Sequence, residues 1–155
     1  MNIQALTHDS EEWSKISELF KKMYEEMESN LPKSSLKEDG HLIWTNSQKR
    51  LAGKTSLVAV AKVENNTIGF IHASISAQPQ YFQASSSGHI GHIYISPAYR
   101  NKNIARDLFE FSKLWFKEKN QSTIQLQVLS GNPNAKHFWE SLSFNETMTH
   151  YSISI

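Results

Sequence analysis

The stretch from Ile93 to Arg106 combines residue types that could bind phosphate. It reads as an apolar strand, a stop at Pro97, a turn and the start of a helix. The first N–H groups of a helix have no partner within it, and they lie at the positive end of the helix dipole. The basic residues that add positive charge there are Arg100, Lys102 and Arg106. A pyrophosphate would fit this position, although an ordinary helix start with basic side chains in solvent has the same pattern.

Two histidines precede this turn, and either could accept a proton. His89 and His92 belong to an apolar strand expected over His89–Ile95. Because side chains alternate along a strand, we expect His89 and Ile93 on one face and His92 and Tyr94 on the other, unless a bulge reverses the order. An imidazole titrates close to neutral pH, which suits a general base. The alternative for each histidine is a structural or surface role.

The turn resembles the central motif of the GNAT superfamily of N-acetyltransferases. In that motif a basic residue or glutamine is followed three positions later by glycine and five positions later by glycine or alanine. Arg100 and Ala105 match the pattern, and Asn103 takes the glycine position. After glycine, asparagine is among the residues that best tolerate a left-handed backbone conformation. We therefore expect Asn103 to adopt that conformation.

A second block, from Asn132 to Phe144, resembles another motif of the same superfamily. The matching residues are Asn132, Ala135, Phe138 and Phe144. The sequence departs from the family pattern at Trp139, where tyrosine is usual, and at Ser143, where glycine is usual. An amphipathic helix with an aromatic core face would explain this block if it stood alone. The two blocks at the expected separation favour the family.

The resemblance implies a site for acetyl-coenzyme A along the strand and the turn. The strand residues whose backbone would pair with the pantetheine arm are Ile93, Tyr94 and Ile95. The residues expected around the pyrophosphate are Arg100, Asn101, Lys102, Asn103, Ile104, Ala105 and Arg106. Asn132 would also contact the pantetheine arm. The acetyl group would pass directly to an amine without an acyl-enzyme, which suits a chain that has no cysteine.

The same resemblance implies His89 and Tyr151 as the catalytic residues. Several GNAT families carry a histidine or glutamate general base at the position of His89, and His92 is the second candidate. The tyrosine that often acts as general acid is replaced by Trp139, whose indole N–H cannot donate a proton at useful pH. Tyr151 is therefore the substitute candidate. Its alternative is a half-buried strand aromatic, and coenzyme A thiolate can also leave without an acid.

The hydrophobic pattern predicts two helices, then strands and helices that alternate. The helices are expected after a cap at Asp9 or Ser10, and over His41–Leu51, Ile104–Lys119 and Asn134–Leu142. An interruption is expected at residues 31–35, and a loop at Gln78–Gly88. The strands are expected over Ser56–Val63, Thr67–Ile75, His89–Ile95, Ile124–Leu129 and Thr147–Ile155. The expected fold is α/β, with a mixed, mostly antiparallel sheet, helices on both faces and, by resemblance, a splayed parallel strand pair.

Length and composition limit the classes of function. A chain of 155 residues fits one domain, taken as residues 1–155. Its formal charge of +1 does not favour nucleic acid as a partner, and no apolar segment approaches membrane-spanning length. The absence of cysteine excludes disulfides and thiolate metal sites, and no other metal site is expected. The expected setting is cytoplasmic.

We expect an acetyl-coenzyme A dependent N-acetyltransferase that acts on a primary amine of a small cationic molecule or on a peptide N-terminus. Glu25, Glu26 and Glu28 at the end of the first helix could attract such an acceptor, or could form a solvated face neutralised by neighbouring lysines. The competing function is a non-catalytic acyl-CoA binding or sensing domain of the same fold, for which Trp139 is the best support. Monomer and homodimer remain open.

Overall fold

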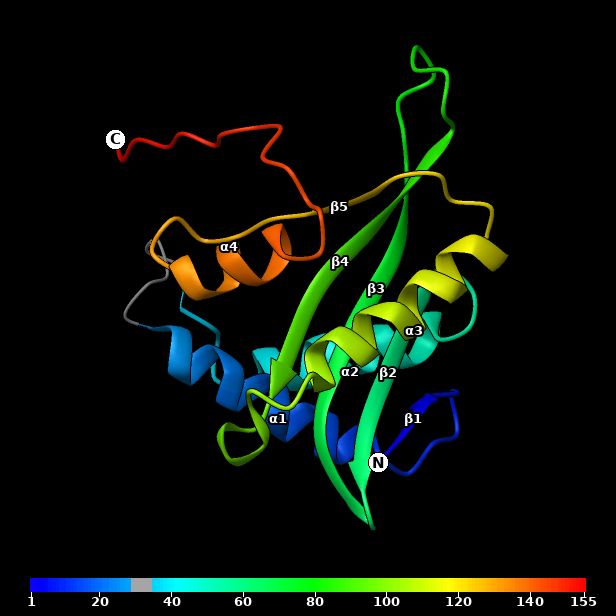
Figure 1. The fold of residues 1–155 in the computed structure, drawn as a ribbon, viewed down its shortest axis with the longest axis vertical. Coiled ribbons are helices and arrows are strands. Elements are labelled where there is room, and N and C mark those ends of the chain that lie inside the picture. The colour runs from blue at the N-terminus through cyan, green and yellow to red at the C-terminus, as the bar shows by residue number, and fades with distance from the viewer. Residues whose placement is uncertain (29–34) are drawn as a thin grey trace.

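A five-stranded sheet lies at the centre of the protein in the computed structural model, which describes residues 1–28 and 35–155 (Figure 1). The strands are β1 (Asn2–Ala5), β2 (Ser56–Val63), β3 (Asn66–Ala77), β4 (Ser86–Ile95) and β5 (Ile124–Leu126). Their order in the sheet is β1-β2-β3-β4-β5, and each pair is antiparallel except β4 with β5. The mixed, mostly antiparallel sheet predicted from the sequence is confirmed.

Helices cover both faces of the sheet, and each face has its own hydrophobic core (Figure 1). The helices are α1 (Trp13–Met27), α2 (Gly40–Leu51), α3 (Ile104–Glu118) and α4 (Pro133–Glu140), with a short 3-10 helix η2 (Pro97–Tyr99). Apolar side chains of α1 and α2 pack on one face, and those of α3 and α4 on the other. Because side chains alternate along β2, Val58 and Val60 face the first core while Leu57 and Ala59 face the second. None of the described helices is long and apolar enough to cross a membrane.

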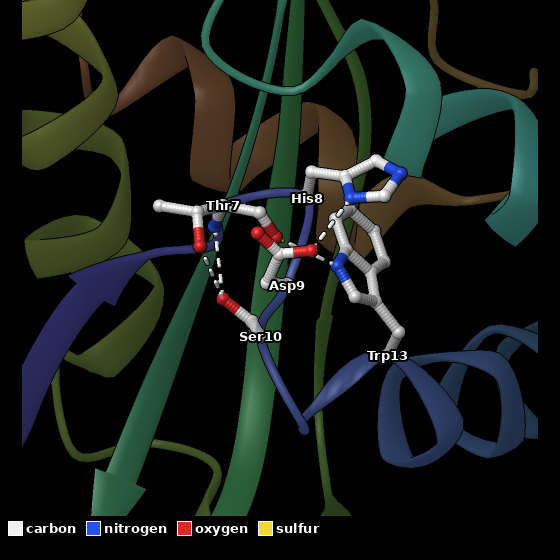
Figure 2. A network of polar contacts seen from close by, with 5 residues as sticks. All are labelled: Thr7, His8, Asp9, Ser10 and Trp13. Atoms are coloured by element: carbon white, nitrogen blue, oxygen red, sulfur yellow. Dashed lines mark hydrogen bonds and ion pairs between the residues drawn. The ribbon is translucent and has the colours of Figure 1, made fainter.

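The approach to α1 is held by local contacts rather than by the predicted cap (Figure 2). Trp13 Nε1 donates to the carbonyl oxygen of Thr7 at 2.9 Å, and Ser10 Oγ accepts from the backbone N–H of Thr7 at 2.9 Å. Asp9 Oδ1 lies 2.8 Å from His8 Nδ1. The helix itself begins at Trp13, and the residue before it makes no capping bond through its side chain. The cap predicted at Asp9 or Ser10 is therefore wrong, because both side chains are used before the helix starts.

The two ends of the chain differ most from the prediction. Strand β1 was not predicted from the sequence; it pairs with β2, for example with Ile3 opposite Ala61. The strand predicted over Thr147–Ile155 is wrong, because that segment is irregular and all of its residues are exposed. Apolar residues at every second position indicate a strand only where one face of that strand becomes buried. In this segment neither face is buried. The predicted interruption at residues 31–35 falls almost entirely outside the described residues, while β4 starts earlier and β5 ends earlier than predicted.

Glu12, the residue before α1, ties this helix to the β2–β3 hairpin. Its carboxylate accepts hydrogen bonds from Lys62 Nζ and Thr67 Oγ1. Those two bonds, the one from Lys62 first, hold the pKa of Glu12 below its usual value of 4.5. Lys62 follows a shift in the register between β2 and β3. The ion pair therefore fixes α1 against an irregular part of the hairpin.

Replacing Glu12 with glutamine should lower the free energy of unfolding by about 1–2 kcal/mol at pH 7, because the hydrogen bonds to Lys62 and Thr67 lose their charge assistance. The folded-state pKa is lowered, so this stabilisation is present above pH 4.5 and disappears as the pH falls through the folded-state value. Urea titrations at pH 7 and pH 3 measure both effects. The control Glu11→Gln changes an exposed carboxylate and should have little effect; an equal loss in the two variants would refute this role.

Candidate functional site

Strand β4 separates from β5 halfway along its length. The residues of β4 that pair with β5 are Gly88, His89 and Ile90. On its other side, β4 stays paired with β3 as far as Ile95. The backbone from Gly91 to Ile95 therefore has an edge that no described strand covers. Such an edge presents N–H and C=O groups with which an extended molecule can pair.

A bulge at Gly91 lies where the two strands part. The register between β3 and β4 steps from His72 opposite His92 to Ala73 opposite Ile90, which leaves Gly91 as the extra residue. A Cβ atom at Gly91 would come within 2.5 Å of His72 Nδ1. The bulge therefore needs glycine here, because the imidazole of His72 occupies the space that a side chain would fill.

The bulge places His89 and His92 on the same face of the sheet. Ser74 pairs with His89, and His72 pairs with His92. Ser74 and His72 are two residues apart on β3, so they share a face, and so do their partners. The prediction from plain alternation, with the two histidines on opposite faces, is wrong, and the extra residue in β4 is the reason. Both histidines lie on the face that α1 and α2 cover.

His92 lies in an enclosed cluster of polar and aromatic side chains. Its Nε2 is 3.2 Å from Tyr24 Oη, and its Nδ1 is 3.3 Å from His72 Nδ1. The rings of Phe20 and Trp44 pack edge-on against it. Burial lowers the pKa of His92 to about 4, and burial together with the nearby His92 lowers the pKa of His72 to about 3. Both imidazoles are therefore neutral at physiological pH.

The lowered pKa of His92 bears on its candidacy as the general base. A base whose conjugate acid has a pKa of about 4 is poorly matched to an ammonium group, whose pKa is roughly six units higher. His92 is therefore poorly suited to proton transfer at neutral pH. His89 is half-buried on the same face, and its role as the base stays a prediction.

The turn after β4 has two residues in the left-handed conformation. Asn103 has φ 61°, as its place in the motif predicted, and Asn101 has φ 60°, which the sequence analysis missed. The first hydrogen bond within α3 runs from the N–H of Asp107 to the carbonyl of Asn103. The three N–H groups before Asp107 thus have no partner within the helix, and Asn103 does not cap them through its side chain. This geometry suits an anion.

Arg100 faces α1 rather than the start of α3. Its Nε donates to the carbonyl oxygen of Ile95 at 2.9 Å, and its guanidinium donates to Glu26 at 2.5 Å. Tyr94 Oη donates to the other oxygen of Glu26 at 2.5 Å. Partial burial alone would raise the pKa of Glu26, but the bonds from Arg100 and Tyr94 outweigh it and the pKa is lowered. Burial and the bond to Glu26 raise the pKa of Tyr94 to about 12.

This network gives Glu26 a structural role that the sequence did not indicate. Glu26 was expected among the surface charges that attract an acceptor, but its carboxylate is taken by two donors from the β4 end of the sheet. The side chains of Glu26 and Arg100 are 40% and 44% exposed, so solvent weakens the attraction between their charges. The pair therefore acts mainly by fixing the end of α1 beside the turn.

Asn132 and Trp139 of the second motif are held in the fold, whereas Tyr151 of the C-terminal segment is exposed. Asn132 is the N-cap of α4, where its Oδ1 accepts from the N–H of Ala135 at 3.0 Å. Trp139 is 6% exposed and packs in the core, so it takes no part in a solvent-accessible site. Tyr151 is 88% exposed, and the structure does not bring its side chain into a shared site with His89. The alternative interpretation of Tyr151 as a half-buried aromatic of a strand is wrong, while its role as general acid stays a prediction.

A hollow of about 200 Å³ lies between the end of α1 and the start of α2. Its charged and polar lining includes Lys21, Tyr24, Glu25, Glu28, Lys37 and Glu38. Three carboxylates face two ammonium groups, so the lining carries a small negative excess. Tyr24 lines this hollow and also contacts His92 of β4, the strand that borders the opening.

A family model matches the sequence of this chain, and solved structures share its fold. A model of the acetyltransferase (GNAT) family matches residues 13–144. Aminoglycoside N-acetyltransferase AAC(6')-Iy in complex with CoA has a TM-score of 0.80 and 17% identity, over 99% of this chain and 93% of that one. Aminoglycoside antibiotic 6'-N-acetyltransferase AAC(6')-IG from Acinetobacter haemolyticus has a TM-score of 0.73 and 24% identity, over 100% and 98%. Ribosomal-protein-alanine N-acetyltransferase from Brucella melitensis biovar Abortus 2308 has a TM-score of 0.71 and 17% identity, over 100% of both chains.

No curated protein sequence matches the chain. At these levels of identity the solved structures establish the fold alone. The family match and the fold agree with each other, since the matched residues extend from the start of α1 to just beyond α4.

The two neutral histidines should make stability depend on pH between about 6.5 and 4. In the unfolded chain an imidazole binds a proton near pH 6.5, whereas in the fold His92 and His72 do so near 4 and 3. The contribution of the two neutral imidazoles to the free energy of unfolding is complete above pH 6.5. It is lost as the pH falls towards their folded-state pKa values. A His72→Gln/His92→Gln variant should therefore lose less stability than wild type from pH 7 to pH 4.5, by about 2–4 kcal/mol. Urea titrations test this, with exposed His150→Gln as the control; parallel curves for the double variant and wild type would contradict it.

Proposed function

We propose that this chain, which belongs to the acetyltransferase (GNAT) family, transfers the acetyl group of acetyl-coenzyme A directly to a primary amine. The observation that carries the proposal is the opening beside β4, where an uncovered strand edge leads to a turn that suits an anion. These are the two features needed to hold a long molecule with amide groups at one end and a pyrophosphate at the other.

The residues around this opening fit acetyl-coenzyme A. The backbone from Gly91 to Ile95 would pair with the amides of the pantetheine arm, and the free N–H groups at the start of α3 would bind the pyrophosphate. Lys102 and Arg106 are exposed beside that helix start and would add positive charge. The Arg100 side chain is taken by Glu26, so we assign it the task of holding the turn in place. Asn132, whose side-chain oxygen caps α4, keeps its amide N–H groups for the arm.

Acetyl-coenzyme A, when bound, supplies the acetyl group as a reactive thioester. The chain's own residues have two tasks in the reaction. A backbone N–H of β4 at the opening would donate to the oxygen that becomes negative in the transition state. His89 would accept the proton that the amine loses, directly or through water, because only a neutral amine has a free electron pair for attack. Trp139 is buried in the core and cannot act as the acid, so Tyr151 stays our candidate for that role, and the thiolate could also leave without an acid.

The acceptor class follows from the hollow between α1 and α2. Its carboxylates, Glu25, Glu28 and Glu38, favour a cationic molecule. Two of the structures with this fold are named for acetylation of aminoglycosides and one for acetylation of an alanine of a ribosomal protein. In each case the name indicates an amine acceptor. We therefore propose a small cationic amine or a peptide N-terminus.

The test of this function is the release of free coenzyme A thiol from acetyl-coenzyme A with a panel of amines. The panel contains spermidine, neamine and a tripeptide with a free N-terminus, and the calorimetric binding of acetyl-coenzyme A is measured beside it. Binding with amine-dependent thiol release supports the proposal. Binding without release from any amine would favour the binding or sensing domain instead, and no binding would remove the cofactor assignment.

Asn103 gives a specific test of the phosphate turn. Its left-handed conformation suits glycine, so Asn103→Gly should keep or improve the affinity for acetyl-coenzyme A. A valine in the left-handed conformation costs about 1–2 kcal/mol, so Asn103→Val should weaken the binding of acetyl-coenzyme A by roughly tenfold. Isothermal calorimetry measures the affinity of both variants for acetyl-coenzyme A. The same two substitutions at Asn101, which has the same backbone conformation, provide the comparison. An unchanged affinity in the valine variant would show that the turn makes no such demand.

His89 gives the corresponding test of the chemistry. His89→Ala should lower kcat by about a hundredfold or more at neutral pH while acetyl-coenzyme A affinity stays almost unchanged. The loss should shrink at higher pH, because more of the acceptor amine is then neutral without help. Steady-state kinetics from pH 6.5 to 9.5 measure this, with exposed His150→Ala as the control. Wild-type turnover in His89→Ala throughout that range would remove His89 from the reaction.

A further inference from the structure

Tyr24 lies between the hollow and the buried histidine pair. Its side chain lines the hollow between α1 and α2. Its Oη is 3.2 Å from His92 Nε2, and its ring packs against Phe20 with centroids 4.9 Å apart. The reaction described above gives this hydroxyl no task. Its position nevertheless links the proposed acceptor site to the strand that borders the opening.

The hydrogen-bond chain behind Tyr24 fixes which nitrogen atoms carry protons. His72 Nε2 is buried and has no hydrogen-bond partner in the part of the chain that the structure describes. A buried N–H without an acceptor is rarer than a buried lone pair without a donor. We therefore assign the proton of neutral His72 to Nδ1, which donates to His92 Nδ1 at 3.3 Å. His92 then carries its proton on Nε2 and donates to Tyr24 Oη.

In this arrangement no group among the described residues accepts the proton of the Tyr24 hydroxyl. Its oxygen already accepts from His92, so the O–H of Tyr24 is available to donate to a bound molecule. The Trp44 ring holds the two imidazoles in their orientations, because it packs edge-on against both His72 and His92 with ring centroids 5.4 Å away. Tyr24 is half-buried and borders the hollow, so a molecule in the hollow can receive its hydrogen bond.

We propose that Tyr24 binds the acceptor by donating a hydrogen bond to an oxygen near the reacting amine. This inference rests on the proposed function and names the class of acceptor. An aminosugar has hydroxyl oxygens near its amine, and a peptide has its first carbonyl oxygen near the N-terminus. A polyamine has no oxygen and gains nothing from this donor. The carboxylates Glu25 and Glu28 attract all three cations, so Tyr24 selects among them.

The test compares acceptors that differ in this oxygen. Tyr24→Phe removes the hydroxyl and keeps the ring against Phe20. Calorimetry with the coenzyme A complex of the protein measures acceptor binding without requiring transfer. The affinity for neamine and for the tripeptide should fall about tenfold, while the affinity for spermidine stays within about twofold. An unchanged affinity for neamine and the tripeptide, or an equal loss for all three, would overturn the proposal.

Variants of His92 separate the positioning role from loss of structure. His92→Gln keeps a donor near the position of Nε2 and should hold the neamine affinity within about threefold of wild type. His92→Leu removes the donor and should match Tyr24→Phe. The control Tyr81→Phe makes the same change at a side chain that is 83% exposed in the β3–β4 loop, and coenzyme A affinity reports the folded state of each variant. If neamine binds to the wild-type protein but is not acetylated, the proposed transfer reaction is refuted while the binding role of Tyr24 stands. If the wild-type protein binds neither neamine nor the tripeptide, the binding role of Tyr24 is refuted.

Discussion

One extra residue in β4 sets the geometry on which the rest of the site depends. At Gly91 the strand gains a residue relative to β3, and a bulge increases the local bend of the strand that contains it. Beyond this point β4 no longer pairs with β5. The same residue places His89 and His92 on one face. A side chain at Gly91 would collide with His72, so the opening, the candidate base and the histidine pair all depend on one position without a Cβ atom.

A second constraint joins the two proposed ligand sites. The proposed acceptor hollow is formed by α1 and α2, while the proposed cofactor site follows β4, and these elements are far apart in the chain. Glu26 connects them by accepting hydrogen bonds from Tyr94 and Arg100. The Tyr24–His92 contact makes a second connection two residues earlier on the same helix. A transfer reaction needs its two reactants held at a fixed separation, and these two contacts hold the elements that would bind them.

The features that the sequence predicted well were those with local causes. The apolar spacing of α3 and the β-branched run of β2 predicted these elements almost to the residue, and the residue type at Asn103 indicated its conformation. The apolar spacing of α1 predicted a helix, but its start was placed too early. Features with distant causes were missed or left open. The face of His89 depends on a bulge, the neutral state of His92 depends on aromatic rings from two helices, and the role of Glu26 depends on partners 68 and 74 residues away. At the C-terminal end, the alternating pattern around Tyr151 predicted a strand that has no buried face.

The central claim is that the uncovered edge of β4 and the start of α3 together hold acetyl-coenzyme A. Amide hydrogen exchange, followed residue by residue with and without saturating acetyl-coenzyme A, tests it most directly. The account predicts slower exchange at amides within residues 91–95 and at Ile104, Ala105 and Arg106, with little change in the β2–β3 hairpin. Slower exchange confined to other parts of the molecule, with these two segments unaffected, would contradict it.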